Sequence, residues 1–486
     1  MRFWITIGLI LVLSAVGLTY EIAAGRVLAP FFGTSLLTWT AVIATVLAGF
    51  SLGSALGGFV AERPRAAAVD AVRKALVATA VLMALSPAAL GLLHAIGARG
   101  TGGMFVSVIL TFFPASVLVS LPSPFLAKLA IEARPGREGS SLGLVLAAGS
   151  CGAIFGAILS GFVALPLIGS VATFAVCGAL TLACIPFLRG CASGGGDGEE
   201  AVAPTAGPPS GGMVGAAAIV MFAGVAGGSP CMYESGLSCL HVADEGGEVR
   251  LYSDGITQAA EQIVEDGDPN GSAPVLALSY TKWLWARLDR DLGPGPSVLF
   301  VGGGGYTLPA KLLAARPDAR AVAVEIDPLV TRVVRWHMPR AGPMIAGAGD
   351  RLGIVHADGR VYLNETDRRF DAAVMDAFSS NSVPAHLVTR ETFERLRTIV
   401  DGPVYVNLID APDGPLARGV HAILMELYPH VYAVRGPPSS LGRTNVLLAA
   451  ARTSLAPVDI LPDGYGPARI SPGRAFTDDR SWAGHR

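Results

Sequence analysis

Residues 298–314 read VLFVGGGGYTLPAKLLA, and AVAVEID follows at 321–327. The first run is an apolar strand, a glycine cluster and a helical pattern, whereas the second is a strand that ends in acids. Glycines allow a ligand to approach the backbone where the amides at the start of a helix point outward. An acid at the end of the next strand can accept hydrogen bonds from ribose hydroxyls. The order predicts a nucleoside site formed by Gly302, Gly303, Gly304, Glu325 and Ile326.

Two later strands also end in acids. GIVHADG at 353–359 ends with Asp358 and Gly359, and FDAAVMDAF at 370–378 contains Asp376. The carboxyl ends of neighbouring parallel strands meet at one edge of a sheet, where open α/β sheets bind ligands. We expect Asp358 to accept a hydrogen bond from the amine of adenine. We expect Asp376 nearer the reacting group, where a carboxylate can orient an amine and accept its proton; a helix-capping or turn aspartate is the alternative.

The rest of the C-terminal half has the pattern of an α/β protein. Short apolar strands alternate with helical patterns, which predicts a mainly parallel sheet covered by helices on both faces. VRLYSDG at 249–255 alternates as a strand does. We therefore assign a small β-rich unit to 229–290, a Rossmann-like nucleoside-binding domain to 291–455 and a C-terminal tail to 456–486.

The N-terminal half is far more apolar. The chain has a mean hydropathy of +0.52 and only 15% charged residues, which is too apolar for a soluble protein of this length. Crossing a bilayer takes about 20 residues. Apolar runs of suitable length lie at about 3–20, 38–60, 75–97, 103–121, 141–165 and 168–188. We predict a multi-pass α-helical membrane domain of about six helices over 1–189, in the inner membrane of a cell.

Two segments connect the halves. Residues 190–212 are rich in Gly, Pro and Ala, which predicts a flexible linker. Residues 213–228 are apolar but shorter than a usual span, so they predict either a seventh span or a re-entrant, interfacial or docking helix.

Lys and Arg gather after the second, fourth and sixth apolar runs, so the positive-inside rule places the N-terminus and the linker in the cytoplasm. We expect the C-terminal domain there too, with 213–228 not crossing.

The net charge and the cysteine pattern limit the kinds of molecule that the protein is expected to bind. The formal net charge of −2 offers no basic excess for phosphates, which argues against nucleic acid and leaves small molecules and the lipid bilayer. Cys231 and Cys239 could pair only in an oxidising compartment, and free thiols are the favoured interpretation. No Cys or His spacing suggests a metal. Lys282, Arg287 and Arg290 predict a solvated basic face or one that rests on anionic headgroups.

From Leu251 to about Ala450 the sequence resembles the polyamine aminopropyltransferases, meaning spermidine synthase and its relatives. In particular, it resembles bacterial proteins in which such a domain is fused to a transmembrane region. The matching stretches are SDGITQ (253–258), VGGGG (301–305), VEIDP (324–328), ADG (357–359), DAFSSNSVPAHLVTRETF (376–393) and, in the membrane half, YEIAAGRVLAPFFGTS (20–35).

The resemblance implies a class I methyltransferase or spermidine synthase-like fold. It also implies an enzyme that moves an aminopropyl or other alkyl group to an amine acceptor, such as a polyamine, and releases methylthioadenosine. The donor would be S-adenosylmethionine or its decarboxylated form. By the same resemblance, Gln258 would contact the sulfonium tail, Glu325 the ribose, Asp358 the adenine and Asp376 the nucleophile.

Two departures from the resemblance concern the amine. Ser379 stands where soluble spermidine synthases have a second aspartate, and Tyr280 is the nearest candidate for the tyrosine of their gate region. Both residues are therefore predicted to contact the substrate. A diamine with two positive charges needs several carboxylates or aromatic faces to hold it, so putrescine is the acceptor most in doubt.

Three functions stay open on the sequence: an aminopropyltransferase, a methyltransferase, and a sensor or transporter that binds an adenosyl ligand without chemistry. The missing diamine acids favour the sensor or transporter, and the retention of Asp376 favours catalysis. Because sulfonium donors are made in the cytoplasm, a transferase also agrees with a cytoplasmic domain. The sequence leaves open whether the chain forms a homo-oligomer.

Overall fold

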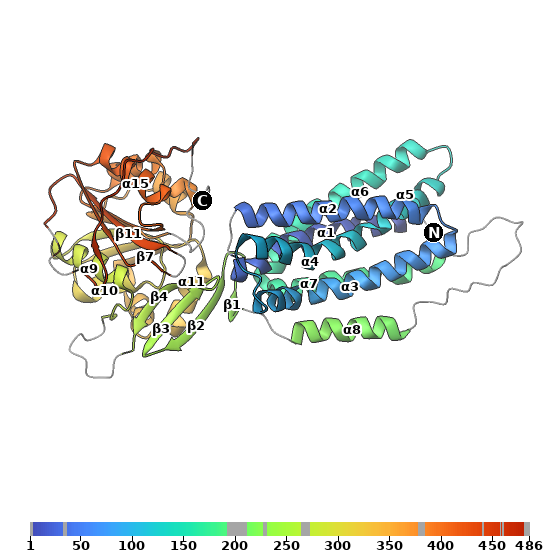
Figure 1. Ribbon diagram of the computed structural model, residues 1–486, viewed down its shortest axis with the longest axis horizontal. Coiled ribbons are helices and arrows are strands. Elements are labelled where there is room, and N and C mark those ends of the chain that lie inside the picture. The colour runs from blue at the N-terminus through green and yellow to red at the C-terminus, as the bar shows by residue number, and fades with distance from the viewer. Residues whose placement is uncertain are drawn as a thin grey trace, which may run out of the picture. The chain divides into compact units, whose positions relative to one another are not determined.

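The computed structural model describes residues 3–32, 36–191, 211–226, 231–263, 273–377, 384–439, 442–456, 458 and 461–480. The chain forms two compact units, Met1–Gly236 and Leu237–Arg486. Figure 1 shows the helices and strands of both.

The first unit is a bundle of apolar helices. They are α1 (Phe3–Phe32), α2 (Leu36–Ala61), α3 (Arg65–Ala95), α4 (Gly100–Ser120), α5 (Pro122–Glu132), α6 (Glu138–Leu159), α7 (Leu165–Cys184) and α8 (Gly211–Ala226), with the short helices η1 (Ser160–Ala164) and η2 (Ile185–Cys191) and a short strand, β1 (Tyr233–Glu234). Five helical stretches within the described residues are apolar and long enough to cross a membrane. A multi-pass membrane domain, as predicted, accounts for them.

The last of these stretches, Glu138–Leu188, reverses direction at Gly169. A straight helix of 51 residues would be about 76 Å long, more than twice the thickness of a hydrocarbon core. Gly169 has φ 75° and ψ 175°, a left-handed region that glycine adopts readily and other residues avoid. The fifth and sixth predicted spans therefore form one apolar stretch that is broken at this glycine.

Contacts between helices give their directions. Between α6 and α1, Gly152 contacts Leu11 and Gly156 contacts Ala15, so these two helices are parallel. Between α1 and α3, Tyr20 contacts Ser86 and Phe31 contacts His94, so these are parallel as well. Between α7 and α3, Gly178 contacts Ala80 whereas Thr181 contacts the earlier residue Leu76, so these are antiparallel. Thus α1, α3 and α6 run in one direction, and α7 returns.

Helix α8 lies against the middle of α3. Met221 packs with Ala80 and Ala84 and also approaches Gly178, which is itself beside Ala80. Further along α8, Gly224 approaches the carbonyl oxygen of Ala84. The contact thus advances along both helices together, so α8 runs parallel to α3. The segment predicted at 213–228 is thus a helix that packs on the bundle.

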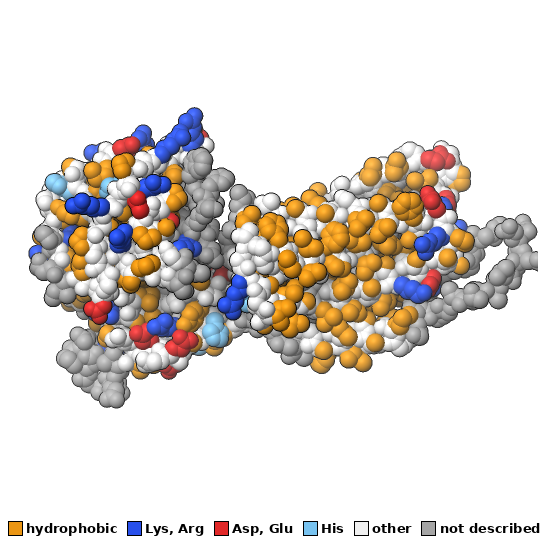
Figure 2. Space-filling model, in the orientation of Figure 1, with side chains coloured by type: hydrophobic (Ala, Val, Ile, Leu, Met, Phe, Trp, Pro, Cys, Tyr) orange, Lys and Arg blue, Asp and Glu red, His pale blue; other side chains and the backbone are white. Residues whose placement is uncertain are grey.

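Charged side chains of the bundle gather at the end where α1 and α3 begin. The Arg134 guanidinium lies over the ring of Phe3, and the Lys128 ammonium donates a hydrogen bond to the carbonyl oxygen of Ala61. Apolar side chains cover most of the visible face of the bundle in Figure 2, and Lys, Arg, Asp and Glu lie near the end at which Figure 1 marks the N-terminus. The basic connections therefore share one end of the bundle.

The second unit contains two sheets. Strands β2 (Cys239–Glu245), β3 (Glu248–Ser253) and β4 (Ile256–Gln262) are antiparallel neighbours. The larger sheet has the order β12-β10-β11-β9-β8-β5-β6-β7. Its strands are β5 (Ser297–Val301), β6 (Arg320–Val324), β7 (Leu352–Val355), β8 (Ala372–Met375), β9 (Val404–Asp410), β10 (His430–Arg435), β11 (Thr444–Ala451) and β12 (Gly466–Pro467).

Strands β5 to β9 are parallel to their neighbours within this set, and β10, β11 and β12 pair antiparallel. The helices are α9 (Ser279–Asp291), α10 (Thr307–Ala315), α11 (Pro328–His337), α12 (Ala341–Gly347), α13 (Gly359–Glu365), α14 (Arg390–Ile399) and α15 (Pro415–Leu427), with η3 (Gly349–Arg351) and η4 (Ala385–Leu387). The central strands are buried throughout, as strands covered on both faces must be. The predicted α/β fold with a small β unit is confirmed.

Two expectations from the sequence are wrong. Cys231 and Cys239 are both disulfide-bonded and are not free thiols. Arg287 is only 3% exposed, so it does not belong to a solvated face. Its guanidinium pairs with Asp291 at 2.8 Å, one helical turn further along α9, and the hydroxyl of Tyr405 donates to the same carboxylate at 2.7 Å.

The contact between α1 and α6 yields a prediction. A Cβ at Gly152 would lie 2.2 Å from the carbonyl oxygen of Leu11, whereas a Cβ at Gly143 of the same helix would meet open space. We expect Gly152→Ala to push the two helices apart and to destabilise the protein by about 1–3 kcal/mol, as overpacking does. Gly143→Ala should keep or raise the melting temperature of the solubilised protein, because Ala favours helix. Equal melting temperatures would contradict the close packing.

Candidate functional site

The carboxyl ends of β5, β6, β7, β8 and β9 lie at one edge of the large sheet, because these strands are parallel. From β5 the chain builds outward through β6 and β7, and then returns to the other side of β5 with β8 and β9. The topological switch point therefore lies between β5 and β8. Open α/β sheets bind ligands in the crevice at such a point.

The glycine cluster brings two backbones together at this point. Gly302, directly after β5, has φ 101°, and a Cβ on it would lie 2.3 Å from the carbonyl oxygen of Asp376. Any side chain here would separate the loop after β5 from the loop after β8. Gly304 (φ 48°) and Tyr306 (φ 54°) are also left-handed, which turns the chain sharply into α10. Position 302 thus requires glycine because the backbone of Asp376 approaches it closely, whereas the sequence predicted glycine there for the approach of a ligand.

Glu325 holds the glycine loop from the next strand. One carboxylate oxygen accepts a hydrogen bond from the amide of Gly303 at 3.0 Å, and the other accepts from the amide of Asp327 at 2.9 Å. Burial raises the pKa of Glu325, although the amides of Asp327 and Gly303 oppose the rise. The carboxylate lies beside the glycines, and the amide of Gly304 is a further donor to it.

Asp376 follows β8 and is held by two donors. The side-chain amide of Asn407 donates to its Oδ1 at 2.8 Å, and the hydroxyl of Tyr280 donates to the same carboxylate. Burial raises the pKa of Asp376 to about 6, and the hydrogen bonds from Asn407 and Tyr280 limit the rise. Asn445 in turn donates to the Asn407 side-chain oxygen at 2.9 Å. A carboxylate with this pKa can accept a proton at neutral pH.

A cavity of about 210 Å³ opens beside this carboxylate. Among the described residues its lining is Ile256, Thr257, Gln258, Leu278, Tyr280, Gly304, Asp376, Asn407, Ile409 and Asn445. A smaller neighbouring cavity is lined by Gln258, Tyr280 and Asp376 together with the glycines from Gly302 to Gly305. Four predicted elements, namely Gln258, Tyr280, the glycine loop and Asp376, are therefore brought together.

The remaining predicted residues lie along the same edge of the sheet. Asp358 follows β7 and caps α13, accepting hydrogen bonds from the amides of Arg360 at 2.8 Å and Val361 at 3.3 Å, and its other oxygen contacts His386 at 3.0 Å. Gly359 is buried at the start of this helix, while the side chain of Ile326 is 51% exposed. Asp358 is therefore the N-cap of α13. Ser379 falls outside the described residues.

Sequence reasoning missed Asn407 and Asn445. Asn407 is 3% exposed and interrupts the otherwise apolar run VYVNL (404–408), a signal that could have been used because buried amides require partners. Asn445 offered no comparable signal, since its contact depends on the antiparallel pairing of β11 with β9. In the part of the chain that the structure describes, no group of three or more His, Cys, Asp or Glu could hold a metal ion.

Comparison with curated proteins finds a partial similarity to polyamine aminopropyltransferases. The polyamine aminopropyltransferase of Vibrio vulnificus is 28% identical over 133 residues, covering 27% of this chain and 42% of that protein. The enzyme of Chromobacterium violaceum is 32% identical over 123 residues, covering 25% and 44%, and that of Saccharolobus solfataricus is 30% identical over 115 residues, covering 22% and 36%. The chain thus spans less than half the length of these relatives. No protein-family model matches it.

Solved structures give a distant likeness as well. A probable spermidine synthase from Corynebacterium glutamicum has a TM-score of 0.43 and 21% identity, and the match covers 51% of this chain and 95% of that one. For the spermidine synthase of Thermotoga maritima the TM-score is 0.34 and the identity 18%, with 46% and 71% covered. The distant and partial similarity of the C-terminal region to polyamine aminopropyltransferases rests on the curated relatives.

The raised pKa of Asp376 leads to a prediction about stability. The folded state keeps the proton up to a pH of about 6, whereas the unfolded chain loses it near the ordinary value for aspartate. Stability from this group is therefore full at low pH and is lost as the pH rises through about 4 to 6. Asp376→Asn cannot ionise and escapes the loss. The melting temperature of Asp376→Asn minus that of wild type should therefore increase as the pH is raised from 4.5 to 7.5.

Asp350→Asn serves as the control, because this aspartate is exposed and its removal should leave the pH dependence as in wild type. A difference between Asp376→Asn and wild type that stays constant between pH 4.5 and 7.5 would contradict the assignment.

Proposed function

We propose that the second unit is a transferase that moves an alkyl group from a sulfonium nucleoside to an amine. The observation that carries the proposal is a half-buried carboxylate, Asp376, which lies against the glycine loop at the switch point of the sheet and lines a cavity. Binding and chemistry would then meet at one place, because the loop after β5 and the loop after β8 touch there. The similarity to polyamine aminopropyltransferases supports an aminopropyl group as the one transferred.

The nucleoside would bind along the edge from the glycine loop to β7. Glu325 would accept hydrogen bonds from the ribose, and Asp358, which already caps a helix, would accept one from adenine. Gln258 lines both cavities and would contact the sulfonium tail. S-adenosylmethionine and its decarboxylated form share these contacts, and the similarity to polyamine aminopropyltransferases favours the form that donates an aminopropyl group.

The chemistry needs only positioning and one base. The nitrogen lone pair of the amine attacks the carbon next to the sulfonium sulfur, the C–N bond forms, and the C–S bond breaks with its electrons passing to sulfur. The leaving group is the neutral thioether methylthioadenosine. Asp376 would orient the amine and accept the proton that nitrogen loses, while Tyr280 and Asn407 hold the carboxylate in place.

The residues that line the cavity beside Asp376 limit the charge of the amine that could act as acceptor. Asp376 is the only acid among the described residues that line it, so one ammonium group of a substrate can be paired and a second would need the aromatic face of Tyr280 or solvent. This supports a small amine, or one end of a polyamine. The same shortage of acids favours the second candidate, a protein that binds an adenosyl ligand as a sensor or transporter without chemistry.

A pair of variants should separate chemistry from binding. Asp376→Asn keeps the size of the side chain but removes the base, so turnover should fall by ~100-fold or more at nearly unchanged affinity for methylthioadenosine. Glu325→Gln should instead weaken nucleoside binding by about 1–3 kcal/mol, the usual effect of an altered partner for buried polar groups. Calorimetry would measure affinity in the purified full chain.

Turnover would be followed by product analysis with either sulfonium donor and a set of amines. Methylthioadenosine as product supports aminopropyl transfer, and adenosylhomocysteine would assign a methyltransferase instead. Nucleoside binding without either product would establish the sensor or transporter. If Asp376→Asn retained its rate within about threefold, well short of a general-base effect, the catalytic assignment would be wrong.

For the compartment, we propose that the chain leaves the membrane after α8 on the side opposite the basic connections. Two observations support this placement over the cytoplasmic one expected from the sequence. Helix α8 runs parallel to α3 and packs against its middle, and α3 begins at the basic end, which the positive-inside rule assigns to the cytoplasm. Cys231 and Cys239 are disulfide-bonded, and disulfides persist in oxidising compartments. A sulfonium donor would then have to be delivered from the cytoplasm.

A reporter that is active only outside the cytoplasm tests this placement. Fused after Arg486 it should be active, and fused after Arg189, which precedes α8, it should be silent. Silence of the first fusion in an intact chain would mean that α8 does not cross and would restore the cytoplasmic assignment. The transferase assay uses purified protein, so its outcome does not depend on this result.

A further inference from the structure

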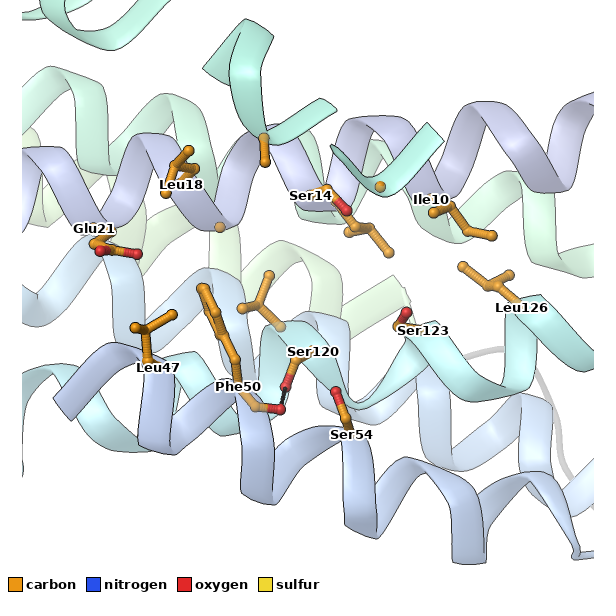
Figure 3. Close-up of a pocket in the computed structure, with 15 residues that line it drawn as sticks. Ile10, Ser14, Leu18, Glu21, Leu47, Phe50, Ser54, Ser120, Ser123 and Leu126 are labelled. Atoms are coloured by element: carbon orange, nitrogen blue, oxygen red, sulfur yellow. Dashed lines mark hydrogen bonds between the residues drawn. The ribbon is translucent and has the colours of Figure 1, made fainter. Parts of the chain in front are cut away.

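The membrane bundle contains a cavity of about 330 Å³ between α1, α2, α4, α5 and α6. Most of its wall is apolar. Its polar groups are four hydroxyls, of Ser14, Ser54, Ser120 and Ser123, and one carboxylate, of Glu21. Figure 3 shows Glu21 toward one end of the cavity and Ile10 and Leu126 toward the other.

Glu21 is the group in this cavity that needs a positively charged partner. Its side chain is 8% exposed, and its Oε2 is buried without a hydrogen-bond partner among the described residues. An unpaired carboxylate at membrane depth is strongly unfavourable, and acids in spanning helices face cavities where they bind ions or substrates. Arg26 of the same helix lies about 140° around the axis from Glu21 by α-helical geometry, so it projects from a different face of α1.

The hydroxyls supply acceptors along the wall. Ser120 donates to the carbonyl oxygen of Phe50 at 3.2 Å, as the dashed line in Figure 3 marks, and this leaves its oxygen lone pairs for an N–H donor. Ser14 projects from α1, Ser54 from α2 and Ser123 from α5, so the hydroxyls come from different helices. A ligand with N–H groups can therefore be held from several sides.

The length of the cavity along α1 fits a linear ligand. Ile10 and Glu21 are separated by about 16 Å along α1, given the rise of an α-helix, and the wall between them on this helix is apolar except for Ser14. One carboxylate matches one positive charge, because a second ammonium group would lie unpaired in a medium of low dielectric constant.

We propose that this cavity binds an organic cation with a single ammonium group and a hydrocarbon chain. The ammonium group pairs with Glu21, and the chain lies along the apolar wall toward Ile10 and Leu126. The site is separate from the nucleoside crevice, and the proposal does not rest on the function proposed for the second unit.

Calorimetric titration of the full chain in lipid nanodiscs tests this site, with empty nanodiscs as blanks. The probes are hexylammonium chloride and 1-hexanol, which differ in charge but have the same chain. Wild type should bind hexylammonium at least tenfold more tightly than 1-hexanol. Glu21→Gln, of nearly equal size, should lose at least tenfold in hexylammonium affinity. Glu62→Gln makes the same change at an exposed position and should bind as wild type does.

Three outcomes would overturn the proposal. Equal affinity of wild type for the amine and the alcohol would mean an apolar cavity filled by lipid. Unchanged amine affinity in Glu21→Gln would place the cation elsewhere, and equal heats from sodium chloride alone would indicate an inorganic ion. Glu21→Gln should melt at or above the temperature of wild type, because it removes an unpaired charge without leaving a void. If it fails to fold, the comparison of amine with alcohol in wild type decides alone.

Discussion

The close approach of Gly302 to Asp376 is the constraint on which the candidate site depends. The amide of Asp376 donates to the carbonyl oxygen of Val301 at 2.9 Å, and no side chain fits between Gly302 and the carbonyl oxygen of Asp376. The loops after β5 and β8 are therefore in contact, and the catalytic carboxylate that we propose lies beside the loop that would bind the nucleoside. A larger residue at Gly302 would separate the two.

Hydrogen bonds hold a half-buried charge in this position. Partial burial disfavours the ionised form of Asp376, and Tyr280 and Asn407 partly offset the penalty. Because Asn407 is itself held by Asn445, the orientation of the carboxylate is fixed through three strands of the sheet, β8, β9 and β11. A base that is already oriented needs little reorganisation when an amine arrives.

Close packing of small residues organises the membrane unit in a similar way. Gly152 and Gly156 lie against the backbone of α1, and Gly49, Gly53 and Gly57 bring α2 against α4 and the start of α5. Lipid offers little hydrophobic drive for association, so helices in membranes associate through such close contacts. The cavity around Glu21 lies between helices that are otherwise packed tightly. Its one carboxylate therefore supports the ligand site that we propose there.

The sequence by itself determined the class of each half. Apolar length identifies spanning helices, and the order of strand, glycines, helix and terminal acid identifies the crevice, because both are local patterns. Gly302 and Asp376 were predicted from such patterns, whereas Gln258 was predicted from the family resemblance. Local patterns do not report long-range partners, however. The tertiary structure decided that Asn407 and Asn445 hold Asp376, that Arg287 is buried against Asp291, that Cys231 and Cys239 are disulfide-bonded, and that α8 runs beside α3. Each of these depends on segments distant in the chain, or on the side of an element that faces the interior, and these are settled only when the elements pack together.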